Sequence, residues 1–180
     1  MYAMNVSMYD NKFINNWGDS VFGLLLKEIS YSKIKGNIFQ NNTTAIFADG
    51  ATKIDFYNNS FENNGWAIKI NSNCMENKVI RNNFINNTFD VSTNGTIVMN
   101  EFRFNYWDKY EGYDLDKDKV GDVPFHPLSL YSVLVEQNAS VMLLFRSFLV
   151  DMLDRTEKII PSLTPESFVD DQPSTKPIKI

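Results

Sequence analysis

The chain has 180 residues, of which 43% are hydrophobic, and a formal net charge of −5. This composition is that of an ordinary globular protein and excludes an intrinsically disordered one. Basic residues do not cluster into a stripe, so nucleic acid is not an expected partner. The single cysteine, Cys74, excludes an internal disulfide and a cysteine-based zinc site.

The main feature of residues 11–105 is a repeated phrase, Asn-x-Phe-x-Asn-Asn. Four copies begin at Asn11, Asn37, Asn59 and Asn82, and a decayed fifth copy begins at Asn100. The repeated phenylalanines are separated by steps of 26, 22, 23 and 18 residues, and they are Phe13, Phe39, Phe61, Phe84 and Phe102. A period near 22 residues is typical of a stacked solenoid.

Short β-prone runs separate the copies of the phrase. Seven residues after Phe39, Phe61 and Phe84 come Ile46, Ile68 and Val91, and the alternating runs 67–70 and 96–99 are predicted strands. No stretch before residue 125 has a sustained helical period. The sequence therefore predicts an all-β fold, a right-handed single-stranded parallel β-helix of about five coils, with a C-terminal helical segment and an extended tail. The expected segments are 1–105 for the coils, 106–128 for an aromatic and acidic loop, 129–160 for the helical segment and 161–180 for the tail.

The repeated Asn and Phe residues are interpreted as scaffold. Asn tolerates the left-handed backbone conformation of a sharp corner, and its amide can hydrogen-bond along a stack of coils. Phe above Phe would fill the interior with stacked rings. Charged residues expected on strands are few and do not recur at one repeat position, so an extended groove for a sugar chain is not expected; these residues are Lys53, Asp55, Lys69 and Asp90.

The first residues carry no secretory signal, because the stretch from Met1 to Asn5 lacks a basic start and an apolar core. A solenoid also needs an atypical capping repeat at its end, and none precedes residue 11. We therefore expect this chain to be the C-terminal portion of a longer protein.

An acidic loop follows the repeats. Asp114, Asp116 and Asp118 alternate with other residues, and Gly121-Asp122 comes next. Alternating carboxylates in a glycine-containing loop can converge on calcium or another hard cation. Lys119 and Phe125 depart from a full calcium loop, so a solvated acidic turn is the alternative.

A helix is predicted from Ser140 to Ile160, with Ser140 as its N-cap. Charged residues interrupt every apolar run near 20 residues, so a transmembrane span is not expected. The apolar face could cover the open end of the solenoid or dock a partner, and the predicted docking residues are Tyr131, Met142, Phe145, Phe148, Leu149 and Met152. The following tail, 161–180, has four of the six prolines and is expected to be extended with little core of its own.

The sequence assembles no catalytic site. One histidine and one cysteine far apart give no nucleophile–base pair, so an enzyme is not expected. Cys74-Met75 is the one cluster of soft ligands, the kind that Cu(I) prefers, and no paired copper motif is evident.

The chain resembles the C-terminal half of the NosD family. The resemblance is carried by Asn105-Tyr-Trp-Asp-Lys-Tyr-Glu-Gly-Tyr-Asp-Leu-Asp-Lys-Asp after the Asn-x-Phe repeats, and by Gly121-Asp-Val-Pro-Phe. Ser129-Leu-Tyr-Ser and Pro161-Ser-Leu-Thr-Pro-Glu also match. Residues 105–131 are the most specific part.

The resemblance implies a periplasmic right-handed β-helix protein that helps to mature nitrous oxide reductase. It implies a non-catalytic copper-handling role, with copper bound transiently, during assembly of the copper–sulfide centre. The implied partners are the membrane subunit of an ABC-type transporter and nitrous oxide reductase or a copper donor protein. On this basis the segment 129–166 is expected to dock the membrane subunit. The alternatives are a carbohydrate-binding or polysaccharide-cleaving β-helix protein and a purely structural solenoid.

Overall fold

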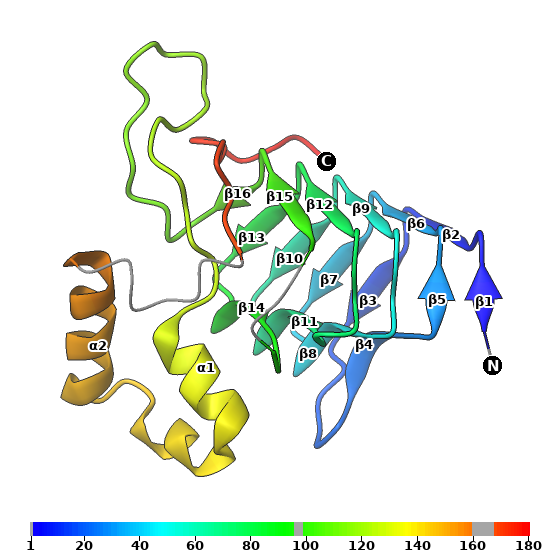
Figure 1. Ribbon diagram of the computed structural model, residues 1–180, viewed down its shortest axis with the longest axis horizontal. Coiled ribbons are helices and arrows are strands. Elements are labelled where there is room, and N and C mark those ends of the chain that lie inside the picture. The colour runs from blue at the N-terminus through cyan, green and yellow to red at the C-terminus, as the bar shows by residue number, and fades with distance from the viewer. Residues whose placement is uncertain (1, 96–98, 160–167) are drawn as a thin grey trace.

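The computed structural model describes residues 2–95, 99–159 and 168–180. Its larger part is a parallel β-solenoid whose coils stack along the horizontal axis of Figure 1, with the helices at the C-terminal end of the stack. Each complete coil places one strand in each of three sheets, so strands from successive coils become neighbours.

Each sheet is named here by its first strand. The β2 sheet consists of β2 (Ser7–Tyr9), β6 (Lys33–Lys35), β9 (Asp55–Tyr57), β12 (Lys78–Ile80) and β15 (Glu101–Arg103). The β3 sheet consists of β3 (Lys12–Ile14), β7 (Ile38–Gln40), β10 (Ser60–Glu62), β13 (Asn83–Ile85) and β16 (Tyr106–Trp107). The β4 sheet consists of β4 (Phe22–Lys27), β8 (Thr44–Asp49), β11 (Trp66–Ile70) and β14 (Phe89–Ser92). A short extra pair joins β1 (Ala3–Met4) to β5 (Ile29–Ser30).

The parallel β-helix fold with a C-terminal helical segment is confirmed, but the number of coils is slightly smaller than expected. Among the described residues, four coils have a strand in all three sheets, and a fifth has only β15 and β16. The predicted strand at 67–70 is β11. Of the other predicted strand, 96–99, residues 96–98 lie outside the described part of the chain.

Stacked aromatic rings fill the interior, as predicted. The ring centroids of Phe13 and Phe39 are 4.8 Å apart, those of Phe39 and Phe61 are 5.0 Å apart, and those of Phe61 and Phe84 are 4.9 Å apart. Ile46, Ile68 and Val91 share one register position in the β4 sheet and are fully buried. The interior is therefore a continuous apolar column, which is the main stabilising term of the fold.

The two asparagines that end each phrase have different tasks. The first, at 15, 41, 63 and 86, adopts a positive φ of 54° to 61° and makes the corner between the β3 and β4 sheets. The second points inward and bonds along the stack: Asn42 donates from N and Nδ2 to Asn64 Oδ1, and Asn64 does the same to Asn87 Oδ1. A matching row starts the phrase, from Asn11 through Asn37, Asn59 and Asn82 to Asn105.

The predicted fifth copy is out of register. Phe102 pairs with Val79 in the β2 sheet, whereas Trp107 pairs with Phe84 and stacks on it at 4.1 Å. The last step of the repeat is therefore 23 residues, from Phe84 to Trp107. The asparagine row decides the register, because Asn82 bonds Asn105 and the aromatic position follows two residues later.

The C-terminal residues close the end of the stack. Asp170 forms a parallel bridge with Phe102 and Ser174 forms one with Tyr106, so the tail lies on β15 and β16 as one more layer (Figure 1). Phe168 is fully buried, with its ring 5.3 Å from that of Phe102. The tail is extended, but the expectation that it has little core of its own is wrong for residues 168–180, because it covers an apolar column that would otherwise face water.

The helical segment is broken into three pieces. These are α1 (Leu130–Gln137), the 3-10 helix η1 (Ala139–Leu144) and α2 (Phe148–Ile159). The expected helix from Ser140 is wrong: Asn138 caps η1 by accepting from Ser140 N, and Arg146, with φ of 62°, separates η1 from α2. Residue 160 and the matching stretch 161–166 lie outside the described residues. None of the described helices is long and apolar enough to cross a bilayer.

Candidate functional site

A buried carboxylate terminates the first asparagine row. Asp170 Oδ2 accepts from Asn105 N, Asn105 Nδ2 and Trp107 Nε1, each at 3.0 Å. Asp170 is fully buried, and burial raises the pKa of its carboxyl although these hydrogen bonds lower it. No motif marked Asp170 in the sequence, because its partners lie 63 and 65 residues away.

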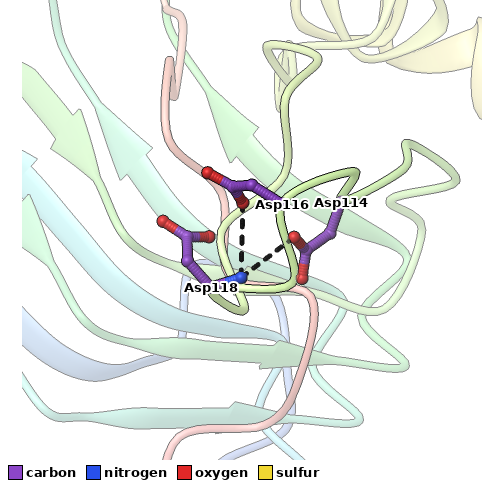
Figure 2. Close-up of side chains that lie close together, drawn as sticks. All are labelled: Asp114, Asp116 and Asp118. Carbon is purple, nitrogen blue, oxygen red and sulfur yellow. Dashed lines mark hydrogen bonds between the residues drawn. The ribbon is translucent and has the colours of Figure 1, made fainter.

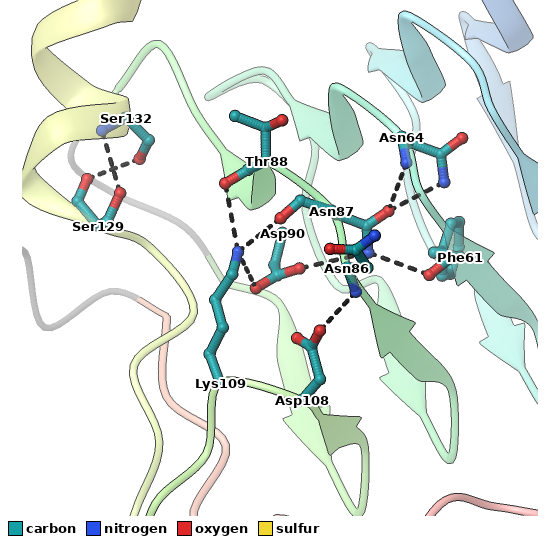
Figure 3. Close-up of polar contacts among 10 residues, drawn as sticks. All are labelled: Phe61, Asn64, Asn86, Asn87, Thr88, Asp90, Asp108, Lys109, Ser129 and Ser132. Atoms are coloured by element: carbon teal, nitrogen blue, oxygen red, sulfur yellow. Dashed lines mark hydrogen bonds and ion pairs between the residues drawn. The ribbon is translucent and has the colours of Figure 1, made fainter. Parts of the chain in front are cut away.

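A second buried carboxylate, Asp90, ends the other row (Figure 3). Asn87 Nδ2 donates to Asp90 Oδ1 at 3.4 Å, and Lys109 Nζ lies 3.0 Å from Asp90 Oδ2. Lys109 also donates to the main-chain oxygens of Asn87 and Thr88. Burial raises the pKa of Asp90 against the lowering effect of Lys109. The Asp90–Lys109 ion pair therefore stabilises the end of the stack of coils.

Three of the four predicted metal-binding carboxylates come together. Asp114, Asp116 and Asp118 each offer an oxygen within 4.8 Å of the others (Figure 2). Asp122, the fourth predicted ligand, is not in this group, and its Oδ2 accepts from Leu115 N at 2.7 Å.

The loop uses these carboxylates to bind its own main chain. Asp118 N donates to Asp114 Oδ1 and Asp116 Oδ1 (Figure 2). Lys119 N donates to Asp114 Oδ2. The hydrogen bond from Asp118 lowers the pKa of Asp116, but desolvation and the charges of Asp118 and Asp122 outweigh it and raise that pKa. These contacts account for the convergence, and calcium has no further support.

The first helix holds the helical segment against the solenoid. Ser129 caps α1 by accepting from Ser132 N (Figure 3). Tyr131 is buried, with its ring 5.6 Å from that of Phe89, and it joins a small apolar cluster with Trp66 and Val135. Tyr131 is therefore unavailable to a partner, and its prediction as a docking residue is corrected.

Polar contacts fix α1 against the solenoid and α2 against α1. Glu136 of α1 forms an ion pair with Lys69 of β11 at 2.5 Å, and the Lys69 ammonium lies 4.4 Å from the centroid of the Trp66 ring. Both carboxylate oxygens of Glu157 in α2 accept from Leu130 N, at 3.3 and 3.1 Å. Burial raises the pKa of Glu157 to about 7.

Seven large apolar side chains remain exposed on η1, α2 and their junction. Leu143 is 89% exposed and Phe148 is 82% exposed. We call this surface the apolar ridge; its members are Met142, Leu143, Leu144, Phe145, Phe148, Leu149 and Met152. It includes five of the six predicted docking residues, and sequence reasoning missed Leu143 and Leu144. The two alternatives for this segment were a cover for the solenoid and a docking surface. Different parts of the segment fit each one, because α1 packs on β14 whereas the ridge stays exposed.

The predicted soft cluster is split between interior and surface. Cys74 is fully buried, its Sγ accepts from Ala51 N at 3.3 Å, and burial raises the pKa of the thiol. The next residue, Met75, is 44% exposed. Cys74 therefore belongs to the scaffold, and the two sulfur atoms do not form one accessible site.

Charged residues do recur at one repeat position, contrary to expectation. Lys33, Asp55, Lys78 and Glu101 occupy the same register position on successive strands of the β2 sheet. Three of these, Lys33, Lys78 and Glu101, were not counted as strand-borne charges in the sequence. Finding the row requires the register, because the sign of the charge alternates from one coil to the next.

Known proteins similar to this chain agree on one family. A family model described as "Periplasmic copper-binding protein (NosD)" matches residues 1–112. The "Probable ABC transporter binding protein NosD" of Stutzerimonas stutzeri is 26% identical over 176 residues, covering 88% of this chain and 40% of that protein. The protein of the same name from Pseudomonas aeruginosa is 26% identical over 172 residues, covering 86% of this chain and 40% of that protein. The chain spans about 40% of the length of these curated relatives.

Proposed function

The chain belongs to the NosD family, and from this premise we propose that it is an accessory, non-catalytic protein for assembly of the copper site of nitrous oxide reductase. In this proposal it acts in the periplasm with an ABC-type transporter. The description of the family as periplasmic copper-binding proteins supports the compartment and the metal. The relatives' name, ABC transporter binding protein, supports the transporter. The role in reductase maturation rests on the resemblance of residues 105–131.

The observation that carries the docking part of the proposal is the apolar ridge. The ion pair of Lys69 with Glu136 and the buried Tyr131 fix α1 on the solenoid, so the ridge is presented on a rigid support. So many large apolar side chains exposed on neighbouring elements favour an interaction site. We assign its partner as the membrane subunit of the transporter, and the solenoid would extend from there towards nitrous oxide reductase or a copper donor protein.

Copper is the cargo in this proposal. Cu(I) favours thiolate and thioether ligands, and Cys74 is enclosed in the solenoid. The exposed soft donors among the described residues are thioethers, namely Met4, Met75, Met99, Met142 and Met152. Met142 and Met152 belong to the apolar ridge, so copper transfer and docking would use the same surface. Thioethers bind without losing a proton, which suits transient transfer.

Co-purification with the transporter tests the docking surface. Phe148→Asp and Leu149→Asp place charges on the ridge and should abolish capture of the membrane subunit by this chain. Leu115→Asp is the matched control, because Leu115 is 77% exposed but lies in the acidic loop. Point substitutions are better than deletion of 129–180, which would also remove Phe168 and Asp170 from the core. Full capture by both ridge variants would reject the assignment.

A further inference from the structure

The outer face of the β2 sheet is hollowed along the solenoid axis. Two adjoining hollows of about 660 and 680 Å³ lie on it, and both are lined by Lys33, Asp55 and Lys78. They extend from Tyr9 in the first coil to Glu101 in the fifth. The face therefore has the shape of a shallow groove that crosses the strands.

Two parallel rows of side chains line this groove. The first row is the alternating series Lys33, Asp55, Lys78 and Glu101. The second row, two residues further along each strand, consists of Tyr9, Lys35, Tyr57 and Ile80, and Arg103 continues it beyond the hollows. Successive members of a row are about 4.8 Å apart, the spacing of neighbouring strands.

The central charges of the first row are not neutralised by neighbours. Glu101 pairs with Arg103 at 3.9 Å, and Lys53 at the rim pairs with Glu76 at 3.7 Å. Within the described residues, no ion pair or side-chain hydrogen bond engages Lys33, Asp55 or Lys78. A row that served only to lock the register would pair its opposite charges across adjacent strands. These groups instead remain available to a ligand.

The pattern selects among classes of ligand. A nucleic acid is bound through many phosphates at once and needs a continuous stripe of cations, whereas only two of the four positions in this row are cationic. A peptide in extended form adds to the edge of a sheet, whereas this groove lies on a face. A sugar chain offers hydroxyl groups that bond both carboxylates and ammonium groups. Its apolar C–H faces can lie on Tyr9 and Tyr57, and one pyranose is close in length to the spacing between coils.

We propose that this groove binds a linear oligosaccharide that carries carboxylate groups, aligned with the solenoid axis. Lys33, Lys35 and Lys78 bind the sugar carboxylates in the hollow nearer the first coil, where three ammonium groups face the two carboxylates of Asp10 and Asp55. Asp55 accepts from sugar hydroxyl groups. The Tyr57 ring, with the Lys35 ammonium 5.8 Å from its centroid, supports one sugar face. This activity is binding only, and it is independent of the apolar ridge and of copper.

Calorimetric titration of the whole chain with hexagalacturonate tests the proposal, with cellohexaose as the neutral probe of equal length. We expect hexagalacturonate to bind with micromolar to millimolar affinity that falls as salt is added. The double variant Lys33→Ala/Lys78→Ala should bind it about tenfold or more weakly, since it loses two charge-assisted contacts. Tyr57→Ala should weaken both probes if both bind.

A charge-matched variant controls for loss of net charge. Lys12→Ala/Lys176→Ala removes two exposed ammonium groups outside the groove and should leave the affinity within about twofold. Circular dichroism confirms that each variant is folded. No heat with hexagalacturonate, or equal weakening by the two double variants, would overturn the proposal. Equal binding of cellohexaose would overturn the carboxylate part. None of these outcomes bears on capture of the transporter subunit, so the two proposals fail separately.

Discussion

Replacing Asp170 by alanine is the sharpest test of how the stack is closed. The change removes the one oxygen that accepts from Asn105 N, Asn105 Nδ2 and Trp107 Nε1, all of them buried. Each buried donor left without an acceptor costs about 1–3 kcal/mol. The variant also loses the cost of burying a carboxylate, which the raised pKa of Asp170 reflects, so the net loss is smaller than the sum.

We expect a net destabilisation of about 3 kcal/mol, the lower end for breaking a buried charged contact. For a protein of this size, that loss lowers the melting temperature by about 6–12 °C. Differential scanning calorimetry measures it, and hydrogen exchange should show faster opening of residues 168–180. Asp171→Ala is the matched control, because Asp171 is exposed. Equal melting temperatures for the two variants would refute the argument that this carboxylate closes the stack.

Three further substitutions test other contacts. Lys109→Met leaves the buried Asp90 carboxylate without its cation and should cost about 3–5 kcal/mol at pH 8. The cost should shrink as the pH is lowered, because burial raises the pKa of Asp90 and protonation removes the unpaired charge. Lys12→Met, at an exposed position, should cost little, and equal losses in urea unfolding would contradict this. Phe61→Ala leaves a cavity in the aromatic column and should lower the free energy of unfolding by about 3–5 kcal/mol, whereas Phe148→Ala on the exposed ridge should lower it very little. Similar unfolding midpoints for the two variants would contradict the placing of Phe61 in the core and Phe148 on the surface. The pKa of the Glu157 carboxyl is raised from 4.5 to about 7, so the folded state holds a proton that the unfolded state has released, and stability should fall as the pH rises through this window. Glu157→Gln should remove about 1–2 kcal/mol of that fall, which is the effect of a pKa shift of about 2.5 units discounted for partial exposure. The same pH profile of the melting temperature in the variant and the parent would contradict this role of Glu157.

The sequence was sufficient for the fold because the repeat is local. An asparagine at a corner and a phenylalanine inside it are set by neighbouring backbone conformation, so Asn41 and Phe39 could be placed without a structure. Register was lost only where two aromatic residues competed. Phe102 matched the phrase by sequence, but the amide row continued through Asn105 and moved the aromatic position to Trp107.

The candidate sites were less accessible to sequence reasoning because they depend on long-range contacts. Five docking residues follow from apolar side chains at helical spacing, but Tyr131 is buried by Phe89, which is far away in the chain. A left-handed residue at Arg146 breaks the expected helix, and no local signal marks it. The charged row of the β2 sheet could not be found without knowing that Lys33 lies beside Asp55.

The two carboxylates at the end of the amide rows also give the solenoid a direction. Every asparagine in a row accepts hydrogen bonds from the coil before it and donates to the coil after it, so the next coil must always supply another acceptor. An ionised carboxylate accepts hydrogen bonds but donates none, so it needs no further acceptor after it. Asp170 and Asp90 thus end these two rows of hydrogen bonds, which run in one direction along the solenoid.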